Sequence, residues 1–164
     1  MNLAANDPTR TSWIPVPTDS DFPIQNLPFG VFIPEDDIIT TGTRIGDTAI
    51  DLSALQQLGY FKGIDLPDDV FLQDTLNDFI ALGRPIWRKV RNRLAEIFDE
   101  NNDKLKSLVD HQNQALFPVD HVQMLMPVFV QDYTDFYSSI EHATNVGKMF
   151  RDPENALLPN WKHI

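Results

Sequence analysis

The sequence predicts an α+β fold of mainly β character, with short strands first and helices after them. Five prolines from Pro15 to Pro34 forbid a helix there and indicate extended chain with tight turns. Short apolar segments bounded by turn residues follow as far as Leu52, and several such strands are typical of a small barrel or sandwich. Beyond Asp74 the apolar residues recur at helical spacing, so helices are expected to complete the domain.

Three strands are expected, at Val31 to Ile33, at Ile38 to Thr41 and at Arg44 to Leu52. Thr41-Gly42-Thr43 and Gly46-Asp47 carry turn residues and are expected to separate or interrupt these strands.

Two helices and a shorter third one are expected after the strands. Asp74 suits the N-cap of the first helix and Gly83 the C′ position at its end. Pro85 suits the first turn of the second helix, which is expected to end at Asn101-Asn102. Leu105 to Asn113 can add a short helix. The apolar faces of the first two helices are Leu76, Phe79 and Ile80, and then Ile86, Val90, Leu94 and Ile97 or Phe98.

Composition narrows the function classes. The 164 residues carry a net charge of −11, which argues against nucleic acid and anionic membranes as partners because phosphate contacts need clustered Lys and Arg. The absence of cysteine excludes disulfides, thiolate metal sites and a Cys nucleophile, so any metal is expected to be a hard ion such as calcium or magnesium. Met1 to Thr11 lacks the apolar core of a signal peptide, and no apolar run approaches the about 20 residues of a membrane helix. We therefore expect a soluble, cytoplasmic protein.

The sequence contains one basic cluster, in the predicted second helix, and two acidic clusters in predicted loops, and each has two interpretations. The basic cluster is read as a solvated helix face that balances nearby acids, with a nucleic-acid site as the alternative. Glu35-Asp36-Asp37 and Asp68-Asp69 are read as solvated loop charges, with metal binding as the alternative. The basic cluster and the acids it would balance are Arg84, Arg88, Lys89, Arg91 and Arg93, and Asp78, Glu96, Asp99 and Glu100.

The sequence changes character after Phe117-Pro118. Val122 to Val130 is an apolar run broken by Pro127, consistent with a strand that enters a new structural unit. Ile140 to Phe150 can form a helix, although Gly147 weakens that prediction.

Asp132 to Arg151 concentrates the residue types that carry chemistry. A carboxylate can bind a hard cation, an imidazole can act as a general base near neutral pH, and Arg can clamp a carboxylate. The alternative is a mixed loop in which Tyr133, Phe136 and Tyr137 pack and the polar groups cap turns. Ser138 and Ser139 lack the Gly-x-Ser-x-Gly elbow of a serine nucleophile.

Several stretches together resemble a known family, the fumarylacetoacetases. The C-terminal ones are Asp132-Tyr133-Thr134-Asp135-Phe136-Tyr137-Ser138-Ser139, His142-Ala143-Thr144-Asn145-Val146-Gly147, Met149-Phe150-Arg151 and Glu154-Asn155-Ala156-Leu157-Leu158-Pro159-Asn160-Trp161. Upstream, the stretches Ser20 to Phe32, Ile45-Gly46-Asp47, Ile50-Asp51-Leu52 and Leu76 to Trp87 resemble the start of the same family.

The resemblance implies a fold and a domain plan. It implies an SH3-like barrel with helices over residues 13–118 and the start of a β-rich catalytic domain over residues 119–164. Residues 1–12, which precede the resemblance, are polar and aperiodic and are expected to be a flexible N-terminus. The family continues well beyond Ile164, so the chain is expected to hold only the beginning of that catalytic domain and to be inactive alone.

The resemblance also implies an activity and a site. The family hydrolyses the carbon–carbon bond of 4-fumarylacetoacetate, in tyrosine and phenylalanine breakdown, and forms homodimers. By motif, Asp135 resembles a ligand of the calcium or magnesium ion, Tyr137 and Arg151 resemble substrate-binding residues, and His142 resembles the general base. Two alternatives remain, a non-catalytic SH3-like binding or regulatory module and an RNA-binding barrel, the latter disfavoured by the acidic charge.

Overall fold

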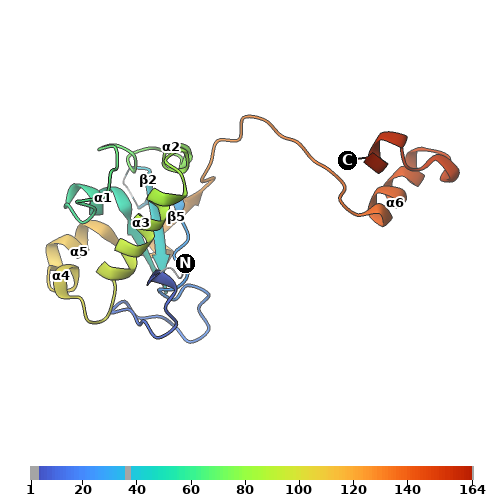
Figure 1. The fold of residues 1–164 in the computed structure, drawn as a ribbon. Coiled ribbons are helices and arrows are strands. Elements are labelled where there is room, and N and C mark those ends of the chain that lie inside the picture. The colour runs from blue at the N-terminus through green and yellow to red at the C-terminus, as the bar shows by residue number, and fades with distance from the viewer. Residues whose placement is uncertain (1–3, 36–37, 164) are drawn as a thin grey trace. The chain divides into compact units, whose positions relative to one another are not determined.

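An antiparallel sheet of five strands organises the first part of the chain (Figure 1). Its strands follow the order β4-β3-β2-β1-β5, so β4 and β5 form the two edges. The strands are β1 (Gly30–Pro34), β2 (Thr40–Ile45), β3 (Thr48–Asp51), β4 (Leu116–Pro118) and β5 (Val122–Leu125). The α+β class is confirmed, but in the part of the chain that the structure describes the sheet is open and not closed into a barrel.

The structure, a computed structural model, describes residues 4–35 and 38–163. Asp36-Asp37 of the predicted acidic loop and Met1 to Leu3 of the predicted flexible terminus lie outside the described residues. The chain divides into two compact units, Met1–Phe129 and Val130–Ile164. No helix within the described ranges is both long and apolar enough to cross a membrane.

The second strand corrects a predicted turn. Thr41-Gly42-Thr43 is the middle of β2, where Gly42 pairs with Gly30 of β1 on one side and Asp51 of β3 on the other. A glycine is needed here because a Cβ atom on Gly42 would collide with the ring of Phe32. A glycine in sequence alone indicates a turn, whereas the Phe32 ring that requires it here becomes apparent only in the fold.

The next turn is confirmed, and it is followed by an unexpected helix. Gly46 takes a φ of 52° in the Gly46-Asp47 turn between β2 and β3. The predicted strand from Arg44 to Leu52 is therefore a hairpin, and it ends earlier than expected because Asp51 caps a helix. The Asp51 carboxylate accepts a hydrogen bond of 2.9 Å from the Ala54 amide, which starts α1 (Leu52–Gln57).

Helix α2 (Asn77–Ala81) begins later than predicted, and Asp74 is not its N-cap. The Leu76 amide, which an Asp74 cap would have to bind, donates instead to the Pro127 carbonyl at 2.8 Å. Leu76 and Phe79 are buried as expected, whereas the side chain of Ile80 is 44% exposed. A contact from a distant part of the chain thus sets the start of this helix.

Helix α3 (Arg84–Ile97) confirms the predicted start of the second helix, but it ends at Ile97, before the expected Asn101-Asn102. Gly83 has a φ of 79° and follows the end of α2, and Pro85 lies in the first turn of α3. Of its predicted apolar stripe, Val90, Leu94, Ile97 and Phe98 are buried in the same core cluster as Val31 of β1 and Ile50 of β3. The predicted Ile86 is only partly buried.

Two short helices replace the single one expected between Leu105 and Asn113. They are α4 (Asp103–Lys106) and α5 (Val109–Ala115). The Asn102 side chain caps α4 by accepting from the Lys104 amide at 3.0 Å, and Leu105 of α4 is fully buried.

The basic residues of α3 do more than form a solvated face. Arg93 pairs with Glu96 at 3.3 Å, as the balancing interpretation expects, but it also donates to the Tyr60 carbonyl at 2.6 Å. Arg91 donates to the Gln25 carbonyl. These two cations therefore tie loops to the helix, and each is used as a hydrogen-bond donor to backbone.

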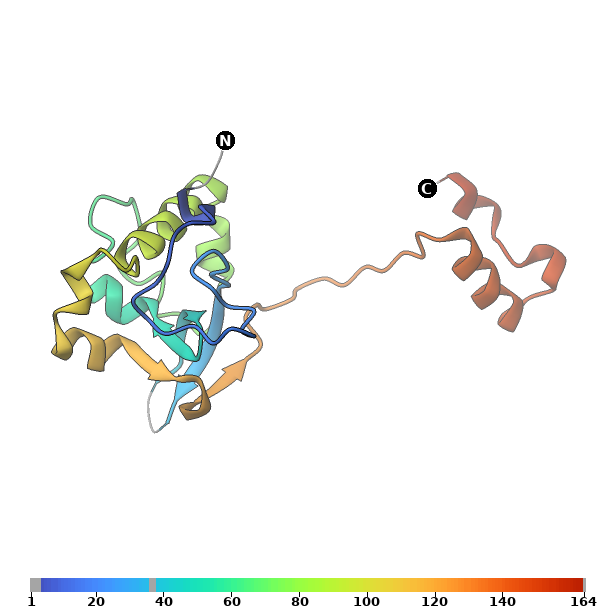
Figure 2. The same ribbon diagram turned by 90° about the horizontal axis from the view of Figure 1, so that it is seen from below.

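The N-terminal segment packs along α3 and closes the core. Figure 2 shows η1 (Ala4–Asn6) lying beside α3. The Ala5 amide donates to the Asn92 side chain at 3.2 Å, and the Trp13 indole donates to the Ile97 carbonyl at 3.1 Å. Ala5 is fully buried, so at least this part of the segment that we expected to be flexible belongs to the core.

The first compact unit extends past Pro118 because β5 joins its sheet. Val31 of β1 pairs with Leu125 of β5, and the short turn η2 (Val119–His121) connects β4 to β5. Val122 to Leu125 is a strand as predicted, but it completes the first sheet. The domain limit at residues 118 and 119 is a property implied by the family and stays a prediction.

Candidate functional site

The predicted chemistry lies on and around helix α6 (Ile140–Phe150), in the second unit. Ser139 is its N-cap, because the hydroxyl oxygen accepts from the His142 amide at 3.2 Å. The same hydroxyl donates to a Glu141 carboxylate oxygen at 2.8 Å. Hydrogen bonds from its own backbone amide and from Ser139 hold the pKa of Glu141 below its ordinary value. Ser139 is thus used to start a helix, which further weakens its reading as a nucleophile.

Gly147 is required for packing within this unit. A Cβ atom on Gly147 would lie 2.8 Å from the carbonyl carbon of Ala156, closer than real Cβ contacts come. The glycine that weakened the helix prediction therefore permits the chain after α6 to fold back onto the helix. The returning segment contains the 3₁₀ turns η3 (Pro153–Asn155) and η4 (Pro159–His163).

This return creates a cavity of about 340 Å³ beside α6. Both residues that we predicted to bind substrate, Tyr137 and Arg151, line it. Arg151 donates to the Ala156 carbonyl at 3.4 Å, and the Trp161 indole donates to the Tyr137 carbonyl at 3.1 Å. The other lining residues are mostly apolar: Ala143, Val146, Gly147, Phe150, Ala156, Leu157, Leu158 and Asn160.

His142 lies next to this cavity without lining it. Its ring meets the ring of Tyr137 edge to face, with centroids 4.9 Å apart and an interplanar angle of 74°. The side chain is exposed to solvent. An imidazole in this position can exchange a proton with water, and its neighbour Tyr137 connects it to the cavity.

Asp135 is not part of this cavity. It lies in an exposed, irregular segment before α6. Within residues 4–35 and 38–163, no three His, Asp or Glu side chains come close enough together to hold a metal ion. Since calcium takes about 6–8 oxygen ligands, the described residues do not by themselves fit the cation that the resemblance implies.

The mixed-loop alternative also needs correction. It required Tyr133 and Phe136 to pack, but these side chains are 84% and 64% exposed. Trp161 and Gly147, which have no predicted role, also shape the cavity. Two signals point to Trp161: it lies in a stretch that resembles the family, and its indole is a hydrogen-bond donor.

The chain thus combines an α+β domain with a helical segment. The small cavity of that segment is lined by the aromatic residues Tyr137, Phe150 and Trp161 and by the basic residue Arg151. A model of the family "Fumarylacetoacetase N-terminal" matches residues 25–127. Since that is more than half of the chain, the chain belongs to this family.

Complete proteins extend the comparison. The chain is 45% identical over 152 residues to a fumarylacetoacetase of Arabidopsis thaliana, 45% over 154 residues to one of Caenorhabditis elegans, and 44% over 154 residues to one of Homo sapiens. These matches take in 92 to 93% of this chain and 36 to 37% of each relative. The chain therefore spans little more than a third of the length of the curated relatives it matches.

Proposed function

We propose that this chain is the N-terminal part of a fumarylacetoacetase, a hydrolase that cleaves a carbon–carbon bond of 4-fumarylacetoacetate to give fumarate and acetoacetate. One observation carries the proposal. The similarity to proteins of that name reaches 92% of the chain and so takes in much of the second unit as well as the first. We further propose that the chain alone does not catalyse the reaction, that the complete enzyme is a cytoplasmic homodimer, and that the sheet of the first unit corresponds to the SH3-like barrel of the family.

The proposed roles rest on the surroundings of each residue. Arg151 lines the cavity, and its guanidinium can bind a substrate carboxylate through two parallel hydrogen bonds. Tyr137 lines the same cavity and offers a hydroxyl to the substrate. His142, in contact with the ring of Tyr137, is proposed as the base that removes a proton from the attacking water.

The reaction balances with these parts. Water, losing its proton to His142, adds to the carbonyl carbon next to the bond that breaks. The bond electrons pass to the acetoacetate carbon, where the neighbouring carbonyl accepts them as an enolate. That carbon then takes back the proton that His142 removed from the water, and the new carboxylic acid releases its own proton to solvent. The products are the two carboxylates, fumarate and acetoacetate.

Asp135 is proposed as one ligand of a calcium or magnesium ion. Because the described residues assemble no cluster of metal ligands, the remaining ligands would have to come from polypeptide outside this chain. No step above therefore depends on the ion.

A non-catalytic binding module is the second candidate. One observation favours it: the first unit has its own continuous core and a cavity of its own, and neither uses the second unit.

Joining the chain to the rest of a relative separates the two candidates. The portion of the human protein beyond the match would be fused to residue 164, and loss of the diketone would be followed by absorbance. We expect hydrolysis by the fusion and none by either part alone. A fusion that folds but stays inactive would favour the binding module, and hydrolysis by the 164-residue chain alone would refute the inactivity that we propose.

A further inference from the structure

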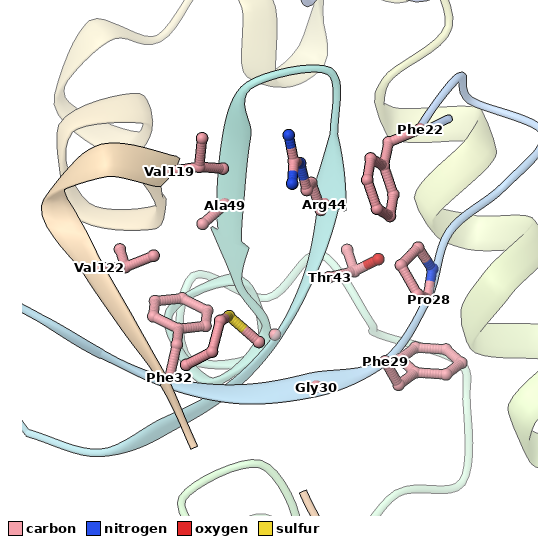
Figure 3. A pocket seen from close by; sticks show the side chains of 12 residues that line it. Phe22, Pro28, Phe29, Gly30, Phe32, Thr43, Arg44, Ala49, Val119 and Val122 are labelled. Carbon is pink, nitrogen blue, oxygen red and sulfur yellow. The ribbon is translucent and has the colours of Figure 1, made fainter. Parts of the chain in front are cut away.

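Two cavities of the chain offer different chemistry to a ligand. The cavity on the sheet of the first unit, of about 390 Å³, is lined mostly by apolar side chains (Figure 3). The charged side chain that lines it, Arg44, lies over the ring of Phe22, 4.1 Å from the centroid, and pairs with Asp47 at 3.1 Å. The cavity beside α6 is lined by Tyr137 and Arg151, the two residues proposed to bind substrate. The positions of these two side chains therefore decide what the second unit can bind.

Tyr137 is fixed neither by a helix nor by burial. It lies in an irregular stretch that precedes α6, and it is 44% exposed. In the part of the chain that the structure describes, its one hydrogen bond joins its carbonyl oxygen to the indole nitrogen of Trp161, which donates at 3.1 Å. Its ring also meets the His142 ring edge to face, with 4.9 Å between the centroids. Because a hydrogen bond is directional, the contact with Trp161 fixes the backbone from which the Tyr137 ring projects.

Trp161 reaches Tyr137 because the chain after α6 folds back onto the helix. Gly147 lets the Ala156 carbonyl approach α6, where a side chain at position 147 would collide with it. Pro159 then opens the turn η4, and its ring fixes the φ angle of the first residue of that turn. The indole in this turn lines the cavity together with Tyr137. One wall of the cavity is thus held by a residue 24 positions further along the chain.

We propose that Trp161 is a positioning residue for substrate binding: its indole N–H holds Tyr137 at the cavity wall and against His142. This role rests on the proposed function, in which Tyr137 offers its hydroxyl to the substrate. Because Trp161 acts through Tyr137, its loss weakens the binding of substrate and transition state alike. Such a change raises KM and leaves kcat nearly unchanged, whereas a role in the chemistry itself would lower kcat.

The first measurement follows the contact between Tyr137 and His142 by NMR in the 164-residue chain. The two rings lie close enough for their protons to give a nuclear Overhauser effect. Trp161→Phe keeps an aromatic ring but removes the hydrogen-bond donor, so this effect should be lost. The amide signals of Ala143 and Gly147, both in α6, report whether the helix is intact in the variant.

Two further variants separate the donor from the shape of the side chain. Benzothienylalanine at position 161 keeps the two-ring shape and carries sulfur in place of the N–H group. It should therefore lose the effect as well, and it decides the question where Trp161→Phe disturbs α6. Trp87→Phe is the matched control, because the Trp87 indole donates to the Phe79 carbonyl at 2.8 Å within the first unit. This control should keep the effect at its parent strength.

The kinetics of the fusion with the remainder of the human protein test the consequence for binding. Both replacements at position 161 should raise KM about tenfold, as the loss of one positioning hydrogen bond implies, and should change kcat less than about threefold. Trp87→Phe should leave both constants unchanged. A parent fusion without any hydrolysis would refute the proposed function, and the NMR comparison would then decide the role of Trp161 by itself.

Three results would overturn this assignment. One is an unchanged Overhauser effect between Tyr137 and His142 in the benzothienylalanine variant. Another is a rise of KM in Trp87→Phe equal to that in Trp161→Phe. The third is a fall of kcat with unchanged KM in the variants at position 161, which would place Trp161 in the chemistry itself.

Discussion

Asn77 and Phe129 hold each other through a reciprocal pair of hydrogen bonds. The Phe129 amide donates to the Asn77 side-chain oxygen at 2.9 Å, and the Asn77 side-chain nitrogen donates to the Phe129 carbonyl at 3.0 Å. Together with the bond from Leu76 to Pro127, this pair fastens the chain after β5 to the start of α2. It lies at the last residue of the first compact unit, and so it accounts for where that unit ends.

Limited proteolysis should therefore leave a resistant fragment that ends near Phe129, and not near Pro118. The segment after it is exposed and irregular as far as α6, so it is open to cleavage. Asn77→Ala removes both bonds and should make local opening easier by about 1–2 kcal/mol, which moves the cut toward Leu125. The fragment masses report the cut.

Asn113→Ala is the matched control, because Asn113 is an exposed residue of α5. It should leave the cleavage site at Phe129. Cleavage of the parent chain at Pro118, with β5 released, would contradict the role assigned to β5.

The contrast between α2 and α3 explains which parts of the fold the sequence could predict. Gly83 and Pro85 act locally, through a positive φ and a fixed first turn, and their helix boundary was predicted correctly. Asp74 and Gly42 were misread because Pro127 and Phe32, which are distant in sequence, decide their surroundings. Local chemistry is visible in a sequence, whereas partners brought by the fold are not.

For the candidate site, too, the sequence supplied the residue identities but not their contacts in space. The residues came from a resemblance, which supplies identities and roles but no distances. The contact of Tyr137 with His142 and the shared cavity of Tyr137 and Arg151 depend on how the chain returns to α6 at Gly147. No spacing in the sequence indicates that return, and the four roles themselves stay predictions.

Gly42→Ala should destabilise the first unit by about 1–3 kcal/mol. The added methyl group meets the Phe32 ring and the Ile50 carbonyl oxygen, and backbone in the middle of a sheet cannot move away. Gly30→Ala, in the neighbouring strand, meets only the flexible end of Met124 at 3.2 Å and should change stability by less than about 1 kcal/mol. Urea unfolding of both variants measures the difference, and equal losses would show that the Phe32 contact is not responsible.

Thr43→Val should stabilise the first unit by about 1 kcal/mol. Replacing a buried, unpaired hydroxyl by a methyl group removes a desolvation cost without changing the shape. Thr48→Val should have almost no effect, since Thr48 is half-buried in a strand that tolerates either residue. A loss of stability in Thr43→Val, measured by the same urea titration, would mean that the hydroxyl is paired in solution.

Tyr60 should make the folded state less stable at high pH. Burial raises its pKa above the ordinary 10.0, and its hydroxyl lies 2.8 Å from the Nδ1 atom of His111. Above about pH 10 the unfolded chain releases the tyrosine proton while the folded chain retains it, so the contribution is complete below pH 10 and is lost as pH rises through the folded pKa.

Tyr60→Phe should remove this part of the pH dependence while lowering stability at neutral pH, because the contact with His111 is lost. Unfolding measured between pH 7 and 11 tests the sign. A parent chain whose stability does not fall above pH 10 more steeply than that of Tyr60→Phe would contradict the raised pKa.

The last prediction concerns the fusion of this chain with the remainder of a relative. Substitutions of the three proposed residues should change different kinetic properties of that fusion. His142→Ala removes the proposed base and should lower kcat by about 10²–10⁴ with little change in KM. Arg151→Lys keeps the charge but loses the planar pair of donors, so it should raise KM more than it lowers kcat. Asp135→Ala should weaken the response to added calcium or magnesium, with partial rescue by excess cation. Lys148→Arg, a conservative change on α6 outside the cavity, serves as the control and should leave both constants unchanged. Full kcat in the His142→Ala fusion would defeat the assignment of the base, and equal losses of kcat in all three variants would indicate damage to the fold of α6 instead of separate roles.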